Sequence, residues 1–145
     1  MLLKFCQCLL LASASALCQA ASLTVDSAWA RVSPPGAKVG VAYMTLFNPG
    51  AVAVEITSIE TPAAANTQVH DTINDNGMLK MRQIVPLVVA AGERLSLEPG
   101  GKHMMLMGLH QGLTAGTEVV VSLTLATGEV VLVTVPVSQT NPAEQ

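Results

Sequence analysis

A histidine and three methionines fall within the stretch His103–Met107, which reads His-Met-Met-Leu-Met. Side chains alternate between the two faces of an extended strand, so His103, Met105 and Met107 would share one face. An imidazole and a thioether two residues apart on one face can bind the same soft metal ion. The alternative interpretation is a core strand, in which the methionines serve packing and the histidine lies at the surface.

A turn signal brings a second histidine and methionine together. Asn76 and Gly77 form the strongest short-range signal for a two-residue hairpin turn. With that turn, Thr72 lies opposite Met81, and His70 lies on the same face, diagonal to Met81. Diagonal neighbours have Cα atoms about 7–8 Å apart, which long side chains can span. The alternative for this pair is a polar hairpin face on which Met81 covers part of the core.

The two pairs together predict one metal site of four residues: His70, Met81, His103 and Met105. The chain has only three histidines, and two of them belong to these pairs, which argues against a chance arrangement. The third histidine, His110, follows the strand and is expected at the surface. Met104 is expected to point into the core, and Met107 to support the site or to pack.

The first 20 residues have the pattern of a secretory signal. Lys4 is followed by an apolar run and then by small residues up to Ala20, after which we expect cleavage. The run is shorter than the ~20 residues of a membrane span. A lipid anchor at Cys18 is the alternative, although Leu17 is larger than such processing normally accepts. All three cysteines lie in this segment, so the mature chain has no disulfide and no thiolate ligand.

Removal of this segment, with Lys4, leaves 125 residues and a net charge of −4. That length suffices for one domain with its own core, which we expect over residues 21–138, followed by a short polar tail at 139–145. There is no basic patch, which argues against nucleic acid binding. No later apolar stretch is long enough to span a membrane, so the mature chain is expected to stay outside the membrane, as a monomer.

Strand patterns fill the mature chain, and helix signals are nearly absent. Short blocks rich in Val, Ile, Leu and Thr alternate with turns that contain Gly, Pro and Asn. The expected strands span residues 23–31, 40–48, 54–60, 68–72, 78–85, 94–98, 103–108, 118–125 and 129–137. Many short strands with regular turns indicate an all-β protein, either an antiparallel β-sandwich or a barrel.

The four candidate ligands are spaced as His70-x10-Met81-x21-His103-x-Met105. This spacing resembles that of the periplasmic copper chaperone family PCu(A)C, which binds Cu(I). The similarity covers about residues 28–136 and includes the segments Trp29–Arg31, Ala42–Asn48, Leu97–Gly101 and His103–Leu109. Two features differ. Thr72 stands where some members have Met, and the C-terminal residues lack the His- and Met-rich tail that binds extra Cu(II) in some members.

The resemblance implies a Greek-key β-sandwich of the cupredoxin-like or immunoglobulin-like kind. It implies Cu(I) held near the surface by two His nitrogens and two Met sulfurs. It further implies a periplasmic chaperone that carries copper toward the CuA centre of cytochrome c oxidase subunit II, directly or through a Sco-type partner. The chemistry agrees, because thioethers favour Cu(I) and imidazole binds a metal when it is neutral.

Two other functions stay open from the sequence: general periplasmic copper scavenging or buffering, and a metal-free β-sandwich interaction module. An electron-transfer protein of the blue-copper type is disfavoured, because such a site needs a Cys thiolate. An enzyme is not expected, because the chain has no convincing nucleophile or acid–base group of residues.

Overall fold

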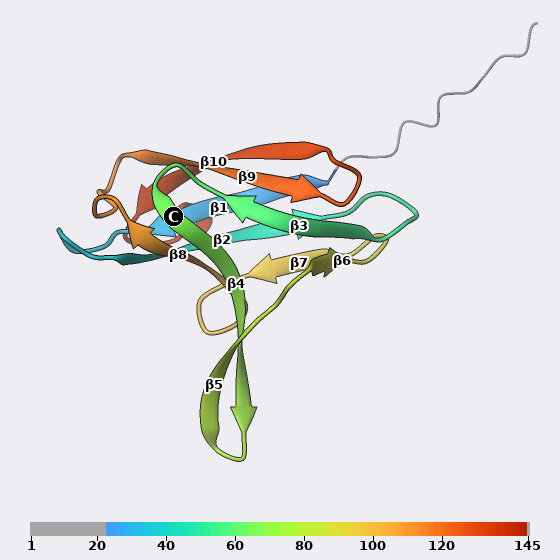
Figure 1. Cartoon of the computed structure of the whole chain (residues 1–145), viewed down its shortest axis with the longest axis horizontal. Helices are drawn as coiled ribbons and strands as arrows, with labels where there is room; N and C mark the ends of the chain where they lie inside the picture. Colours follow the sequence, from blue (N-terminus) through green and yellow to red (C-terminus); the bar gives the residue numbers. More distant parts are fainter. Residues whose placement is uncertain (1–22, 145) are drawn as a thin grey trace, which may run out of the picture.

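The computed structural model describes residues 23–144 (Figure 1). The expected signal segment with its cleavage position, and Gln145, lie outside the described residues. The elements are β1 Thr24–Arg31, β2 Val39–Phe47, β3 Val54–Glu60, β4 Ala64–Asp75, β5 Met78–Gln83, β6 Leu87–Val89, β7 Arg94–Leu97, β8 His103–Leu109, β9 Glu118–Leu125, β10 Val130–Ser138 and the 3-10 turn η1 Pro142–Glu144. Between residues 23 and 144, no helix is long and apolar enough to cross a membrane.

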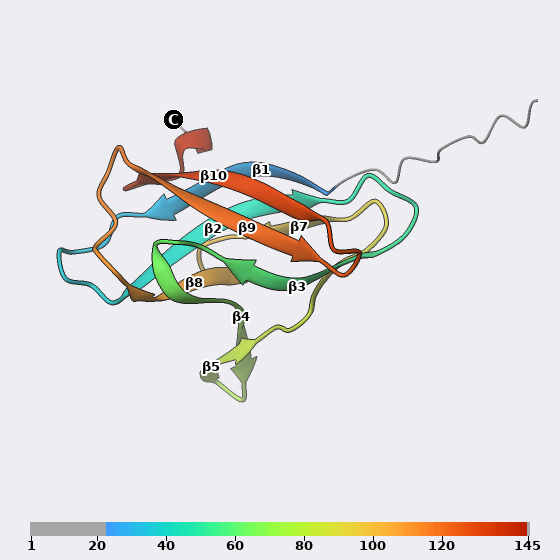
Figure 2. The ribbon, with the colours of Figure 1, turned by 45° about the horizontal axis from the view of Figure 1, so that its top comes forward.

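The strands form two layers, and β9 and β3 lie in front of β2 and β8 in Figure 2. One layer has the order β5-β4-β8-β2-β1, and β7 pairs with the half of the β2 edge that β8 leaves free. The other layer has the order β10-β9-β3-β6. The all-β prediction is therefore confirmed. One pair departs from the antiparallel arrangement: β1 and β10 pair in parallel at Ala30↔Val137 and Arg31↔Ser138, where the edges of the two layers meet.

An aliphatic core fills the space between the layers, and strand alternation decides which side chains enter it. In β8, Met104 and Leu106 are fully buried, whereas the three residues that flank them face the other side and are half-buried. Val121 and Leu123 of β9 enter the same core from the opposite layer. The predicted division of His103–Met107 into a core face and an outer face is confirmed.

The strand prediction is close to the structure, and the two largest differences concern β6 and the start of β4. The short strand β6 was not predicted, since its three residues carry too little pattern. Strand β4 begins at Ala64, four residues before the predicted start at Gln68. This first part of β4 is uncharged and mostly polar, and it is held in strand form by its pairing with β8 at Ala64↔Leu109 and Thr67↔Leu106.

The part of β4 that follows His70 and the whole of β5 continue beyond the sandwich as a projecting hairpin. This hairpin, residues 71–83, is called the arm below (Figure 1). All six residues of β5 are exposed, and in the described part of the chain β5 pairs only with β4. At its tip, Asn76 and Gly77 have φ values of 54° and 86°, the positive values that a type I′ turn requires. The turn gives the pairs Asp75↔Met78 and Thr72↔Met81, so the predicted register is confirmed.

Trp29 is buried, but it lies outside the aliphatic core. Its strand partner is Tyr43, and the two ring centroids are 4.8 Å apart. The next pair along, Ala30↔Ala42, enters the core, so the two rings lie on the outer face of the layer. The Arg31 guanidinium lies 5.8 Å from each ring centroid. This single tryptophan, 3% exposed, is a suitable reporter of unfolding.

The neighbours Met104 and Met105 should differ sharply in their contribution to stability. Met104→Ala leaves a cavity in the core and should lower the free energy of unfolding by about 2–5 kcal/mol. Met105→Ala removes a half-buried side chain on the outer face and should lower it by less than about 1 kcal/mol. Urea unfolding followed by Trp29 fluorescence measures both. Equal losses would show that the two faces are assigned wrongly.

Candidate metal centre

The centre is built by the pairing of β4 with β8. His70 and His103 are direct cross-strand partners, and Gln68 is the partner of Met105. Their side chains lie on the outer face, because the alternate pair Val69↔Met104 points into the core. The two imidazole rings are 6.0 Å apart between centroids and meet edge to face at 79°. The backbone register alone thus places three of the four predicted ligands together.

His70 makes the closest contacts in the centre. Its Nδ1 lies 2.9 Å from the sulfur of Met105, and its Nε2 lies 3.0 Å from Gln68 Oε1. An amide oxygen can only accept, so the Nε2–H donates to Gln68. In this tautomer Nδ1 carries a lone pair that faces the Met105 sulfur. An imidazole nitrogen and a thioether sulfur that face each other in this way are both available to a soft metal ion.

His103 is oriented by the main chain. Its Nδ1 lies 3.0 Å from the carbonyl oxygen of Gly101, which can only accept a hydrogen bond. The proton is therefore on Nδ1, and Nε2 keeps its lone pair. A metal-binding histidine commonly donates its other ring N–H to a carbonyl, which fixes both the tautomer and the ring orientation. His103 is prepared to bind through Nε2, and His70 through Nδ1.

Met81 comes from the arm and is the most exposed of the four residues. It pairs with Thr72 and is therefore diagonal to His70, on the same face of the sheet. Its side chain is 66% exposed, while the other three predicted ligands are half-buried. The structure thus brings His70, His103 and Met105 into one cluster and places Met81 one diagonal step away, within the reach of a long side chain.

Burial and the neighbouring His103 both favour the neutral form of His70. Burial lowers the pKa of His70 below its ordinary value of 6.5, and the nearby charge of His103 in its protonated state lowers it further. A neutral imidazole is the form that binds a metal ion. The environment of His70 therefore keeps it ready for binding at neutral pH.

The surroundings add little negative charge to the centre. Asp71 and Asp75, which follow His70 on the arm, form ion pairs with Lys102 at 3.5 Å and with Lys80 at 2.6 Å. Among residues 23–144 there is no group of three or more His, Cys, Asp and Glu side chains that could hold a metal. A metal ion in this centre would depend on the methionine sulfurs, which selects a soft ion.

Two supporting groups were not predicted from the sequence. Gln68 had a usable signal, because it stands two residues before His70 and so shares its strand face. The carbonyl of Gly101 had no such signal, because every residue has a main-chain carbonyl and the residue type does not show which one will accept a hydrogen bond. The other histidine, His110, is exposed beyond the end of β8, as predicted.

Comparison with known proteins decides the family. The family model described as "Putative lipoprotein LpqE-like" matches residues 23–137. The chain is 30% identical to CuI-DR1885 from Deinococcus radiodurans, a solution structure, with 88% of this chain and 86% of that chain covered and a TM-score of 0.68. The chain belongs to the PCu(A)C copper chaperone family. The family membership predicted from the His/Met spacing is confirmed.

Two further proteins are similar to this chain. "Putative lipoprotein Lxx21020" of Leifsonia xyli subsp. xyli (strain CTCB07) is 32% identical over 88% of this chain and 76% of its own length. The copper-bound PCuAC domain from PmoF2 has a TM-score of 0.70 over 83% of this chain and 96% of its own, at 15% identity. At that identity the likeness supports the fold alone, and it agrees with the cupredoxin-like sandwich predicted for the family.

The metal-free protein should show His70 titrating below pH 6.5 in an NMR pH titration. Because the unfolded chain then binds more protons at this position, the free energy of unfolding should fall as the pH drops from above 6.5 through the pKa of folded His70. The variant His103→Gln removes the neighbouring charge and should move the His70 pKa part of the way back up. Titration of His70 above 6.5 would contradict this assignment.

Proposed function

We propose that this protein is an exported Cu(I) chaperone that binds one ion through His70, Met81, His103 and Met105. The observation that supports this most is the direct pairing of His70 with His103, with the Met105 sulfur 2.9 Å from His70 Nδ1. Membership of the PCu(A)C family and the 30% identity to a Cu(I)-bound relative point the same way. The protein is proposed to carry copper and not to catalyse a reaction.

The ligand set suits a carrier. Two thioethers and two neutral imidazoles bring no negative charge, so the bound ion keeps its positive charge. Thioethers favour Cu(I), and a methionine sulfur is not protonated at ordinary pH. Met81 is largely exposed on the arm, so a receiving protein can replace this ligand first while the other three still hold the ion.

The family description names a lipoprotein, which agrees with export, and we propose the periplasm as the location. We further propose that the copper passes toward the CuA centre of cytochrome c oxidase subunit II, directly or through a Sco-type protein. A scavenging or buffering protein would hold Cu(I) in the same centre but would not pass it to these acceptors. Anaerobic transfer to each purified acceptor therefore separates delivery from buffering.

Anaerobic competition with a chromophoric Cu(I) chelator tests the ligands. Met81→Ala should weaken Cu(I) binding at least about tenfold, which corresponds to ~1.4 kcal/mol. Met78→Ala is the matched control, because Met78 is on the same strand, is 65% exposed and points to the opposite face. A stoichiometry of one ion per chain is expected. Equal affinity in the two variants would remove Met81 from the ligand set.

A second comparison tests the choice of histidines. His103→Ala should lower the Cu(I) affinity far more than His110→Ala, because His110 lies beyond the strand and outside the cluster. Both variants should keep the circular dichroism spectrum of the parent. Equal losses of affinity in the same chelator competition would show that the centre uses a different histidine.

A further inference from the structure

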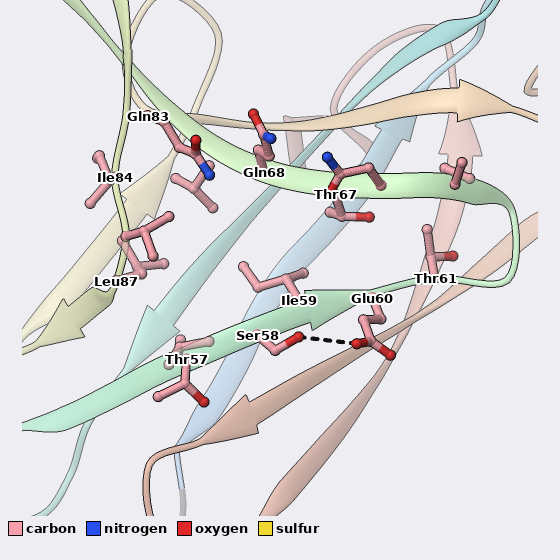
Figure 3. A pocket seen from close by; sticks show the side chains of 16 residues that line it. Thr57, Ser58, Ile59, Glu60, Thr61, Thr67, Gln68, Gln83, Ile84 and Leu87 are labelled. Carbon is pink, nitrogen blue, oxygen red and sulfur yellow. Dashed lines mark hydrogen bonds between the residues drawn. The ribbon is translucent and has the colours of Figure 1, made fainter.

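A cleft of about 470 Å³ lies between β3 and the first part of β4 (Figure 3). One end is the turn at Thr61, where β3 leads into β4, and the other end is formed by residues 83–87. Figure 3 shows side chains of both strands along its length, with Ile59 and Ser58 on one side and Thr67 and Gln68 on the other. The volume is in the range of the small-molecule sites of proteins, ~300–1,000 Å³.

The main chain along both sides of the cleft lacks strand partners. β3 pairs with β9 on one edge, but on the other edge β6 covers only Val54–Ile56, which leaves residues 57–60 open. β4 pairs with β8 on one edge, but on the other edge β5 covers only residues 70–75, which leaves residues 64–68 open. In the described part of the chain, no other strand pairs with these two segments.

Thr67 concentrates unused hydrogen-bonding groups on the β4 side. The Val69 carbonyl accepts from the Ile84 N–H at 2.8 Å, on the edge away from β8. Main-chain groups alternate in direction along a strand, so those of Thr67, two residues earlier, point to the same edge and into the cleft. The Thr67 Oγ1 is also buried and has no hydrogen-bond partner among the described groups. A buried polar atom without a partner is costly, and a ligand would satisfy it.

The β4 edge also lacks the usual protection against strand addition. Proteins commonly guard an open edge with lysine, proline or a bulge. The open segments read Thr-Ser-Ile-Glu and Ala-Ala-Asn-Thr-Gln, with no lysine, arginine or proline, and of the two only the β3 segment has a register shift, between Ile56 and Ser58. The one charged residue, Glu60, accepts a hydrogen bond from the Ser58 hydroxyl at 3.2 Å. The cleft is therefore open to a neutral extended chain.

We propose that this cleft binds an extended peptide segment of a partner protein, which adds as a strand to the open edge of β4. Main-chain hydrogen bonds would supply affinity, and alternate side chains would supply specificity. Inward side chains of the peptide would be apolar, since they meet Ile59, Ile84 and Leu87, and outward ones polar. The described C-terminal turn η1 packs against β1, which does not line the cleft, so it is not the occupant.

The peptide would lie beside the metal centre. Gln68 belongs to the lining of the cleft, and its side chain contacts His70 Nε2 at 3.0 Å. A partner bound along residues 64–68 would therefore stand next to the centre without occupying it. This inference goes beyond the copper function and stands on the open edges and the buried Thr67 hydroxyl, whether or not the centre binds Cu(I).

Selection of a phage library of random dodecapeptides on the immobilised protein tests the proposal. Alternating apolar and polar sequences should be enriched, and a synthetic peptide of this kind should shift the NMR amide signals of residues 57–60 and 64–68. Thr67→Pro removes an N–H that β8 does not use and should weaken peptide binding at least tenfold. The Cu(I) affinity of that variant should equal that of the parent, which separates this test from that of the copper function.

A change in the peptide gives a control that does not depend on the folding of a variant. N-methylation of every second residue blocks strand addition and should also reduce binding at least tenfold. Three outcomes would overturn the proposal: no enriched sequence, equal binding of the N-methylated peptide, or signal shifts confined to another surface. A dimer that Thr67→Pro dissociates, seen by light scattering, would assign the cleft to a second copy of this chain instead.

Discussion

The register between β4 and β8 is the constraint on which the centre depends. It sets His70 directly opposite His103 and sends Val69 and Met104 into the core. A shift by one residue would reverse both faces, which would bury the imidazoles and expose the apolar side chains. The core therefore enforces the geometry of the centre: the hydrophobic free energy that fixes Met104 inside also fixes Met105 and His103 outside.

Strand alternation made much of this predictable. The faces of His103–Met107 follow from period-two alternation, and the arm register follows from the turn at Asn76 and Gly77. The pairing of His70 with His103 was not predictable in the same way, because no turn joins β4 to β8 in sequence. The expectation that these two residues meet came from the His/Met spacing of the family. The beginning of β4 was not predicted because its strand form comes from pairing with β8. The role of the Gly101 carbonyl was not predicted because it is a main-chain group.

Polar groups around the centre orient the two histidines that are its candidate ligands. The Gln68 side-chain oxygen and the Gly101 carbonyl each accept a hydrogen bond from one imidazole N–H, which leaves the other ring nitrogen with its lone pair. The neighbouring aspartates are paired with lysines: Asp75 with Lys80 of β5, and Asp71 with Lys102, which precedes β8. The centre therefore offers lone pairs without net negative charge, a poor environment for hard divalent ions, which prefer charged oxygen ligands.

The arm has a consequence for the energetics of the whole molecule. Strand β5 is held by a single ladder of hydrogen bonds to β4, and every residue of β5 is exposed. Separation of β5 from β4 therefore breaks few apolar contacts. Segments of this kind open with free energies well below that of global unfolding. Met81 therefore resides in a weakly protected unit, while His70, His103 and Met105 sit on strands anchored by the core. Local fraying and cooperative unfolding are thus separate processes in this protein, and substitutions in the arm can change the first without changing the second.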